Sequence, residues 1–188
     1  MDNTIVYLLG HYGVGKLTVA KALCALTGAR LLDNHLINNV VFSLIRADGR
    51  TPLPKVVWDH ISAIRMIAFE VMEALAPPEF SYVLTNALDE DDPLDRAWYE
   101  RAVLLAQRRG AVFVPVFVTC DEAENARRIP LPDRAANMKH TDAASAMERR
   151  RTRRPLQAAH PNRLDLDTTT ASPEKSAAAI VAHIRALA

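Results

Sequence analysis

Hydrophobic positions along the chain fall into two alternating patterns. Short, largely apolar runs predict strands at residues 4–9, 29–32, 80–84 and 111–118, and a fifth strand is predicted at 163–167. Stretches in which apolar residues recur every three or four positions predict helices at residues 18–27, 36–47, 55–76 and from 173 onward. Capping residues predict further helices at 93–109, 122–128 and 142–153. Strands that alternate with helices over short connections are typical of a three-layer α/β fold around a parallel sheet.

Three details of this pattern make sharper predictions. The helix at 55–76 is expected to bury one face, which carries Val57, Ile61, Ile64, Ala68, Val71 and Leu75. Pro115 interrupts the fourth strand, where it cannot donate a ladder hydrogen bond, so it predicts a bulge or an unpaired edge position. Asp121 follows the same strand and superficially resembles a Walker B acid, but its spacing to Glu124 favours a helix capping box.

Composition and charge narrow the class of protein. A chain of 188 residues is long enough for one domain, here 1–188, and its net charge of +1 produces no overall field for nucleic acid or membranes. Cys24 and Cys120 lie in apolar surroundings without zinc-site spacing, as buried thiols of a reducing compartment do. Because no signal peptide or membrane-spanning run is visible, we expect a cytoplasmic protein, monomeric or homodimeric, with no membrane or nucleic-acid partner.

A glycine-rich turn between the first strand and the first helix carries the strongest chemical signal. Residues 10–18 read Gly-His-Tyr-Gly-Val-Gly-Lys-Leu-Thr, and strand, glycine-rich turn and helix with Gly-Lys is the P-loop arrangement. Backbone N–H groups of such a turn surround a phosphate chain at the positive end of a helix. The predicted ATP-binding residues in this stretch are Gly10, Gly13, Val14, Gly15, Lys16, Leu17 and Thr18.

The residue after the lysine departs from the usual pattern. Ser or Thr normally stands there and ligates Mg²⁺, but this chain has Leu17, with the hydroxyl one position later at Thr18. Thr18 is therefore a candidate metal ligand only in this shifted position. A glycine-rich turn with a chance lysine is the alternative, and the correctly placed strand and helix favour phosphate binding over it.

Polar residues follow the second and third strands, at the edge of the sheet where α/β proteins bind ligands. Asp33 could orient or deprotonate an acceptor hydroxyl, hold Mg²⁺ through water, or cap the next helix. His35 could contact the acceptor or belong to the pocket wall or helix start. Asn86 could bond the acceptor or cap its own turn.

Basic residues concentrate between 127 and 154. This segment is either a lid over nucleotide phosphates or a solvated helix face, and we expect both. Arg127, Arg128 and Arg134 are predicted to lie near phosphate, and most of 149–154 in solvent. Nucleic-acid binding by 149–154 is the weakest alternative, because interleaved aromatic residues and an overall basic excess are missing.

These motifs, in this order, resemble the P-loop small-molecule and nucleotide kinases of the shikimate kinase, chloramphenicol phosphotransferase and adenylate kinase type. The resemblance rests on residues 10–18, on Asp33, on the basic stretch with Arg134 and Lys139, and on Asp165 to Glu174 near the end. It implies a five-stranded parallel sheet in the order 2-3-1-4-5, an acceptor lobe at about 34–76 and a mobile lid at about 128–142. Shikimate kinases have Asp-x-Asp after strand two, whereas this chain has His35 in the second acidic position, so shikimate is not supported as the acceptor.

The resulting prediction is an ATP-dependent kinase that acts on a small metabolite or nucleotide, with Mg²⁺. Lys16 would hold the β- and γ-phosphates, Arg134 would offset charge in the transition state, and Asp33 would act on the acceptor hydroxyl or hold Mg²⁺ through water. The alternative, favoured by Leu17, is an ATP-binding module or weak ATPase without a phosphoryl acceptor.

Overall fold

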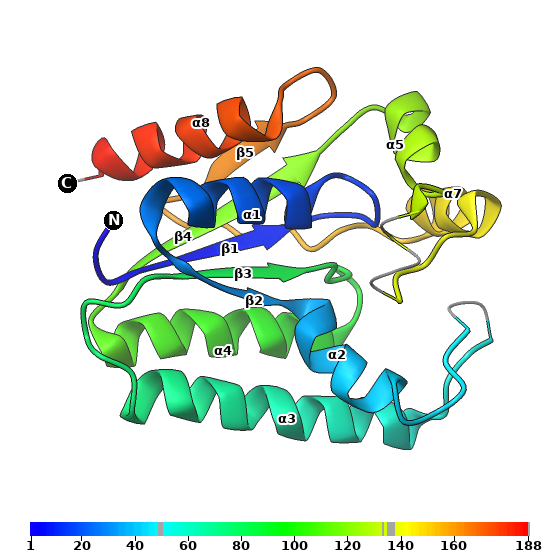
Figure 1. The fold of residues 1–188 in the computed structure, drawn as a ribbon, viewed down its shortest axis with the longest axis horizontal. Helices are drawn as coiled ribbons and strands as arrows, with labels where there is room; N and C mark the ends of the chain where they lie inside the picture. Colours follow the sequence, from blue (N-terminus) through cyan, green and yellow to red (C-terminus); the bar gives the residue numbers. More distant parts are fainter. Residues whose placement is uncertain (49–50, 133, 135–137, 188) are drawn as a thin grey trace.

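A single parallel sheet forms the centre of the molecule. The structure, a computed structural model, describes residues 1–48, 51–132, 134 and 138–187. Its strands lie in the order β2-β3-β1-β4-β5, and every neighbouring pair is parallel (Figure 1). Their bounds are β1 Thr4–Leu9, β2 Arg30–Asp33, β3 Tyr82–Asn86, β4 Val112–Thr119 and β5 Leu164–Asp167. The predicted fold class and strand order are confirmed.

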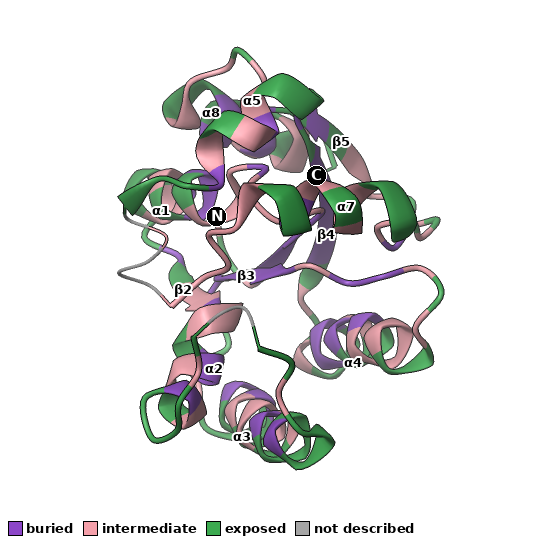
Figure 2. Ribbon diagram, turned by 90° about the vertical axis from the view of Figure 1, so that its right-hand side faces the viewer, coloured by how far each residue is buried: buried purple, intermediate pink, exposed green. Residues whose placement is uncertain are grey.

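Helices cover both faces of this sheet. They are α1 Lys16–Thr27, α2 Asn34–Phe42, α3 Lys55–Ala74, α4 Pro93–Arg109, α5 Glu122–Arg128, α7 Ala143–Thr152 and α8 Pro173–Arg185. In Figure 1, α1 and α8 lie on one side of the strands, and α3 and α4 on the other. Figure 2 shows the buried strands enclosed between helices whose outer surfaces are exposed.

The apolar run of β1 explains this layering. Successive side chains of a strand point to opposite faces, so a strand with helices on both sides must be apolar throughout. Val6 and Leu8 pack in the cluster that contains Leu23 of α1 and Ile180 of α8. Tyr7 packs in the opposite cluster, which contains Phe69 of α3 and Leu105 of α4. The core therefore fixes β1, and with it the turn that follows Leu9.

Two predicted helices differ from the structure. α2 begins at Asn34 rather than at residue 36, because the Asp33 side chain accepts a hydrogen bond from the His35 N–H and caps the helix there. The helix ends at Phe42 rather than at residue 47. In α3 the predicted face is wrong beyond its first half, since Val71 and Leu75 are exposed while Phe69 and Met72 are buried. The first half of α3 packs in the cluster with α2 and the second half in the one with α4, so the buried face rotates along the helix.

Pro115 lies where β4 has a strand neighbour on one side only. It is in register with Tyr7 of β1, and the pairing of β4 with β5 begins one residue later, at Val116. The residues of β4 pair with β1 one for one, so the bulge is wrong, and Pro115 is unpaired only on the side of β5. Asp121 caps α5 by accepting a hydrogen bond from the Glu124 N–H at 2.7 Å, as the capping-box spacing predicts.

Candidate active site

The turn between β1 and α1 requires glycine at two positions for steric reasons. Gly10 has φ +144°, and a Cβ there would collide with the carbonyl oxygen of Val118. Gly13 has φ +77°, and a Cβ there would lie 2.6 Å from both Asn125 Nδ2 and Ile129 Cδ1. Both φ values fall in the region that side-chain-bearing residues rarely adopt. The turn is therefore wrapped closely against β4 and α5 and holds one shape.

Side chains from distant parts of the chain hold this turn. Asn125 Nδ2 donates to the carbonyl oxygen of Tyr12 at 2.8 Å, and Thr168 Oγ1 donates to that of Val14 at 2.8 Å. Gly15 is the N-cap of α1 and supplies no side-chain cap, so the first-turn N–H groups of the helix are left for a ligand. Sequence reasoning missed Asn125 and Thr168, because their positions beside the turn depend on the tertiary fold.

The turn and its surroundings enclose a small hollow of about 140 Å³. Predicted residues that line it are Gly13, Gly15, Lys16, Leu17, Thr18, Asp33, His35, Asn86, Arg128 and Arg134. Gly10 and Val14 shape the turn from beneath, since Val14 is buried and Gly10 abuts β4. Arg127 is a correction: its exposed side chain pairs with Glu124 at 2.6 Å and is not part of this lining.

Lys16 is folded back onto the turn. Its Nζ donates to the carbonyl oxygens of Gly10 and His11, at 2.7 and 2.6 Å. Burial, and then the nearby cations Lys139 and Arg134, lower the pKa of Lys16 to about 7. A polyanion in the hollow would attract the ammonium group, raise the pKa of Lys16 and so favour its charged form.

The carboxylate of Asp33 is held from several sides. Thr85 Oγ1 donates to its Oδ1 at 2.5 Å, and the His35 N–H donates to its Oδ2 at 3.1 Å. Lys139 Nζ lies 3.5 Å from the same Oδ2. The helix-capping role of Asp33 is thus present in the structure, and the carboxylate still borders the hollow above the P-loop.

The basic segment divides between the site and the surface. Arg128 donates to Thr168 beside the turn, and Arg134 donates to the carbonyl oxygen of His140 at 2.7 Å. Asp133 and residues 135–137 of the expected lid lie outside the described residues. Within 149–154, Arg149 and Arg150 turn inward, to Asp89 and to the Cys120 carbonyl. The segment 151–154 is exposed, as expected.

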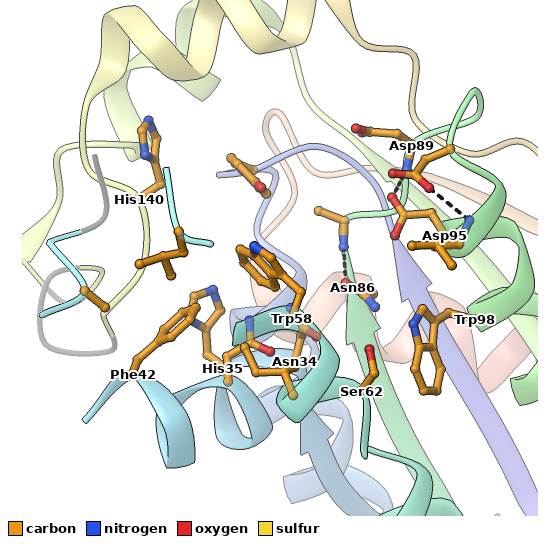
Figure 3. A pocket seen from close by; sticks show the side chains of 18 of the residues that line it. Asn34, His35, Phe42, Trp58, Ser62, Asn86, Asp89, Asp95, Trp98 and His140 are labelled. Atoms are coloured by element: carbon orange, nitrogen blue, oxygen red, sulfur yellow. Dashed lines mark hydrogen bonds between the residues drawn. The ribbon is translucent and has the colours of Figure 1, made fainter. Parts of the chain in front are cut away.

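A larger cavity of about 800 Å³ adjoins the hollow (Figure 3). Its walls come from α2, the following loop, α3, the start of α4 and the basic segment, and include Asn34, His35, Asn38, Phe42, Trp58, Arg65, Asn86, Asp95, Trp98, Met138 and Arg149. His35 and Asn86 thus both line it. The cavity and the hollow also share wall residues, namely Tyr12, Asn34, His35, Asn86, Ala87 and Arg134. A molecule in the cavity would therefore adjoin a phosphate chain on the P-loop.

The electrostatics of the cavity are set largely by burial. Arg65 Nη2 donates to Asn34 Oδ1 at 2.5 Å, and its guanidinium carbon lies 4.6 Å from the centroid of the Trp98 ring. Burial raises the pKa of Asp95 to about 6 and lowers that of His35 to about 4, with the Lys139 charge adding to the effect on His35. Asn86 caps its own turn, because its Oδ1 accepts from the Ala87 N–H at 2.8 Å.

The residues present fit a magnesium ion only in a restricted way. Leu17 offers no ligand, while Thr18 and Asp33 both border the hollow. Among the described residues, no group of three or more His, Cys, Asp or Glu side chains is placed to hold a metal. Mg²⁺ commonly binds through phosphate oxygens, water and one or two protein oxygens. The donor set therefore suits an ion that arrives with the nucleotide rather than a resident one.

Solved structures of small-molecule kinases share the fold of this chain. A protein from Chloroflexus aurantiacus j-10-fl, whose assignment as a kinase is provisional, is 21% identical, with a TM-score of 0.66 over 99% of this chain and 98% of that one. The chain has the P-loop kinase fold. The APS kinase CysC of Mycobacterium tuberculosis, in complex with AMPPNP and APS, is 19% identical, with a TM-score of 0.58 over 98% of each chain. Shikimate kinase from Acinetobacter baumannii, in complex with shikimate, is 16% identical, with a TM-score of 0.53 over 98% of this chain and 94% of that one.

These similarities establish the fold and leave the reaction to be argued from the site. The sequence matches no protein-family model, and no curated protein matches it either. The predicted resemblance to P-loop small-molecule kinases is confirmed at the level of structure. In the described part of this P-loop kinase fold, no helix has both the length and the apolar character needed to cross a membrane.

Proposed function

We propose that this protein is an ATP-dependent kinase that phosphorylates a hydroxyl group of a small molecule bound in the large cavity. One observation carries the proposal: the hollow over the P-loop and the cavity share a wall, and Asp33 borders the hollow directly before Asn34 and His35, which line both. Phosphoryl transfer needs the two reactants in line and their charge neutralised, and a shared wall with convergent cations meets both needs.

Each residue then has a defined role. The first-turn N–H groups of α1 and Lys16 bind the β- and γ-phosphates, and Arg128 and Arg134 line the same hollow. The acceptor hydroxyl oxygen bonds to the γ-phosphorus while the bond to the β–γ bridging oxygen breaks, and that electron pair leaves on ADP. The hydroxyl proton passes to the Asp33 carboxylate, which Thr85 and the His35 N–H hold in place. Mg²⁺, when bound with the nucleotide, would supply further positive charge beside the β- and γ-phosphates.

Transfer of label tests the proposal directly. The protein is incubated with γ-labelled ATP, Mg²⁺ and pools of small hydroxyl compounds, and labelled organic product is separated from inorganic phosphate. Lys16→Ala should abolish product, whereas Lys175→Ala, on the exposed first turn of α8, should leave it unchanged. Product from no pool, together with slow phosphate release that depends on Lys16, would instead support the ATPase alternative that Leu17 favours.

A further inference from the structure

One part of the cavity wall, formed by Phe42 and Trp58, is aromatic and apolar. Phe42 and Trp58 meet edge to face, with ring centroids 5.9 Å apart and planes at 87°. Behind them lies a hydrophobic cluster from α2 and the start of α3, which includes Ile61 and takes in Leu53 and Met138. Figure 3 shows Phe42 and Trp58 beside His35, with Trp98 and Asp95 on the other side. Such a wall favours a flat apolar group over a polyol.

The two tryptophans of the chain, both in the cavity wall, differ in what covers them. Trp98 carries Arg65 and Arg101 over its ring, at 4.6 and 5.3 Å, and meets Phe69 edge-on. Trp58 is 46% exposed, and Phe42 is the one ring or cation recorded against it among the described residues. A large aromatic side chain left open inside a cavity is a surface for a ligand to cover.

A buried carboxamide lies beside this open ring. Asn38 is 4% exposed and lines the cavity, and its Oδ1 has no hydrogen-bond partner in the part of the chain that the structure describes. A buried polar group without a partner destabilises the free protein, and a ligand that supplies one relieves this. The two polar atoms of the amide exchange places by a half-turn about χ2, so Asn38 can present a donor or an acceptor.

Building on the kinase function proposed above, we infer that the acceptor is a hydroxyl compound that carries a heteroaromatic ring and is about the size of a nucleoside. The ring covers Trp58 and Phe42, and a polar atom on its edge bonds the Asn38 amide. Its hydroxyl group reaches toward Asp33, which lines the adjoining hollow. A planar heterocycle matches both the flat apolar surface and the donor–acceptor character of a carboxamide.

Tryptophan fluorescence tests this inference in the full chain, with an unreactive ATP analogue present. The Trp98→Phe variant leaves Trp58 as the one reporter. Adenosine, guanosine, cytidine and uridine are titrated as probes, with ribose as the matched compound without a ring. We expect at least one nucleoside to give a saturating change with a Kd of about 1 mM or below, and at least about tenfold tighter than ribose.

Variants then locate the contact. In the native background, calorimetry should show that Asn38→Leu weakens the nucleoside about tenfold and leaves ribose unchanged, without lowering the Tm, because it removes an unpaired buried amide at similar volume. Trp58→Leu should weaken the nucleoside likewise. Ile67→Ala, on an exposed position of the same helix, should change nothing. Ribose binding as tightly as the nucleosides, saturation by none of them, or equal affinities in Asn38→Leu and Trp58→Leu would overturn the inference.

The same preparation separates this inference from the proposed function. Nucleoside binding that depends on Trp58, without transfer of label from ATP, would sustain the inference about the cavity and refute the kinase. Transfer of label to a compound without a ring would sustain the kinase and refute the inference. Lys16→Ala should lose transfer and keep the fluorescence response.

Discussion

Lys139 Nζ lies 3.5 Å from Asp33 Oδ2, and both side chains are nearly buried. The ion pair joins the end of β2 to the basic segment, and both residues line the hollow over the P-loop. Because Asp33 also accepts from Thr85 and from the His35 N–H, its carboxylate is fixed in direction. A fixed carboxylate beside a phosphate site is suited to take a proton from an acceptor hydroxyl.

Asp33→Asn should therefore separate chemistry from nucleotide binding. We expect kcat to fall by about 100-fold or more, because the amide keeps hydrogen bonds but accepts no proton. The Kd for ATP should change little, since the P-loop contacts remain. Asp165→Asn, on the exposed side of β5, is the matched control and should behave as the native protein. A kcat for Asp33→Asn within about twofold of native would remove Asp33 from the chemical step.

The lowered pKa of Lys16 makes nucleotide binding depend on pH. In the free protein this pKa is about 7, owing first to burial and then to Lys139 and Arg134, with Asp33 and Cys120 acting in the opposite direction. Bound phosphates favour the charged form and raise this pKa in the complex. Below about pH 7 the ammonium is already charged, so affinity is flat. Above about pH 7 the neutral Lys16 must take up a proton when ATP binds, so the affinity for ATP falls by at most tenfold per pH unit.

Calorimetry in two buffers of different ionisation enthalpy measures this proton directly. At pH 8 the native protein should take up close to one proton when it binds ATP, after correction for the nucleotide itself. Lys16→Met binds more weakly and should show no such uptake. Equal heats in the two buffers for the native protein would mean that Lys16 is already charged in the free state.

The parts of this site differ in how far the sequence could reveal them. Local signals suffice for the P-loop, because glycine spacing, strand and helix are all adjacent in the chain. Asp33 and Asn86 could be found because parallel strands end at one edge of the sheet. The sequence could not reveal Arg65, because the buried face of α3 changes along the helix. It could not reveal Asn125 or Thr168 either, because both reach the turn from segments that are remote in the chain. Arg127 was misplaced because its neighbour Glu124 holds it at the surface.

Leu17 offers a test of how the site treats magnesium. Leu17→Ser would restore a hydroxyl at the usual ligand position and should strengthen ATP binding in the presence of Mg²⁺ relative to its absence. Leu17→Ala shortens the side chain without adding a ligand and should leave that ratio at the native value. Calorimetric Kd values with Mg²⁺ and with a chelator give the ratio for each protein. Equal ratios for the Ser and Ala variants would show that a hydroxyl at this position does not reach the ion.

Gly13 and Gly28 allow the steric demand of the P-loop to be measured apart from backbone strain. Both have positive φ, +77° and +73°, but a Cβ at Gly28 meets nothing within 4 Å, whereas one at Gly13 meets Asn125 and Ile129. Gly28→Ala should therefore destabilise the fold by about 1–2 kcal/mol, the strain of a left-handed residue. Gly13→Ala carries the same strain, and overpacking should add about 1–3 kcal/mol.

Urea unfolding of the two variants gives this difference, and ATP titration gives its functional consequence. Gly28→Ala should bind ATP as the native protein does, because Gly28 lies at the far end of α1. Gly13→Ala should bind at least about tenfold more weakly, since moving Asn125 away releases the Tyr12 carbonyl and with it the shape of the turn. Equal unfolding free energies for the two variants would show that the turn yields to the methyl group, and that α5 does not brace the phosphate site.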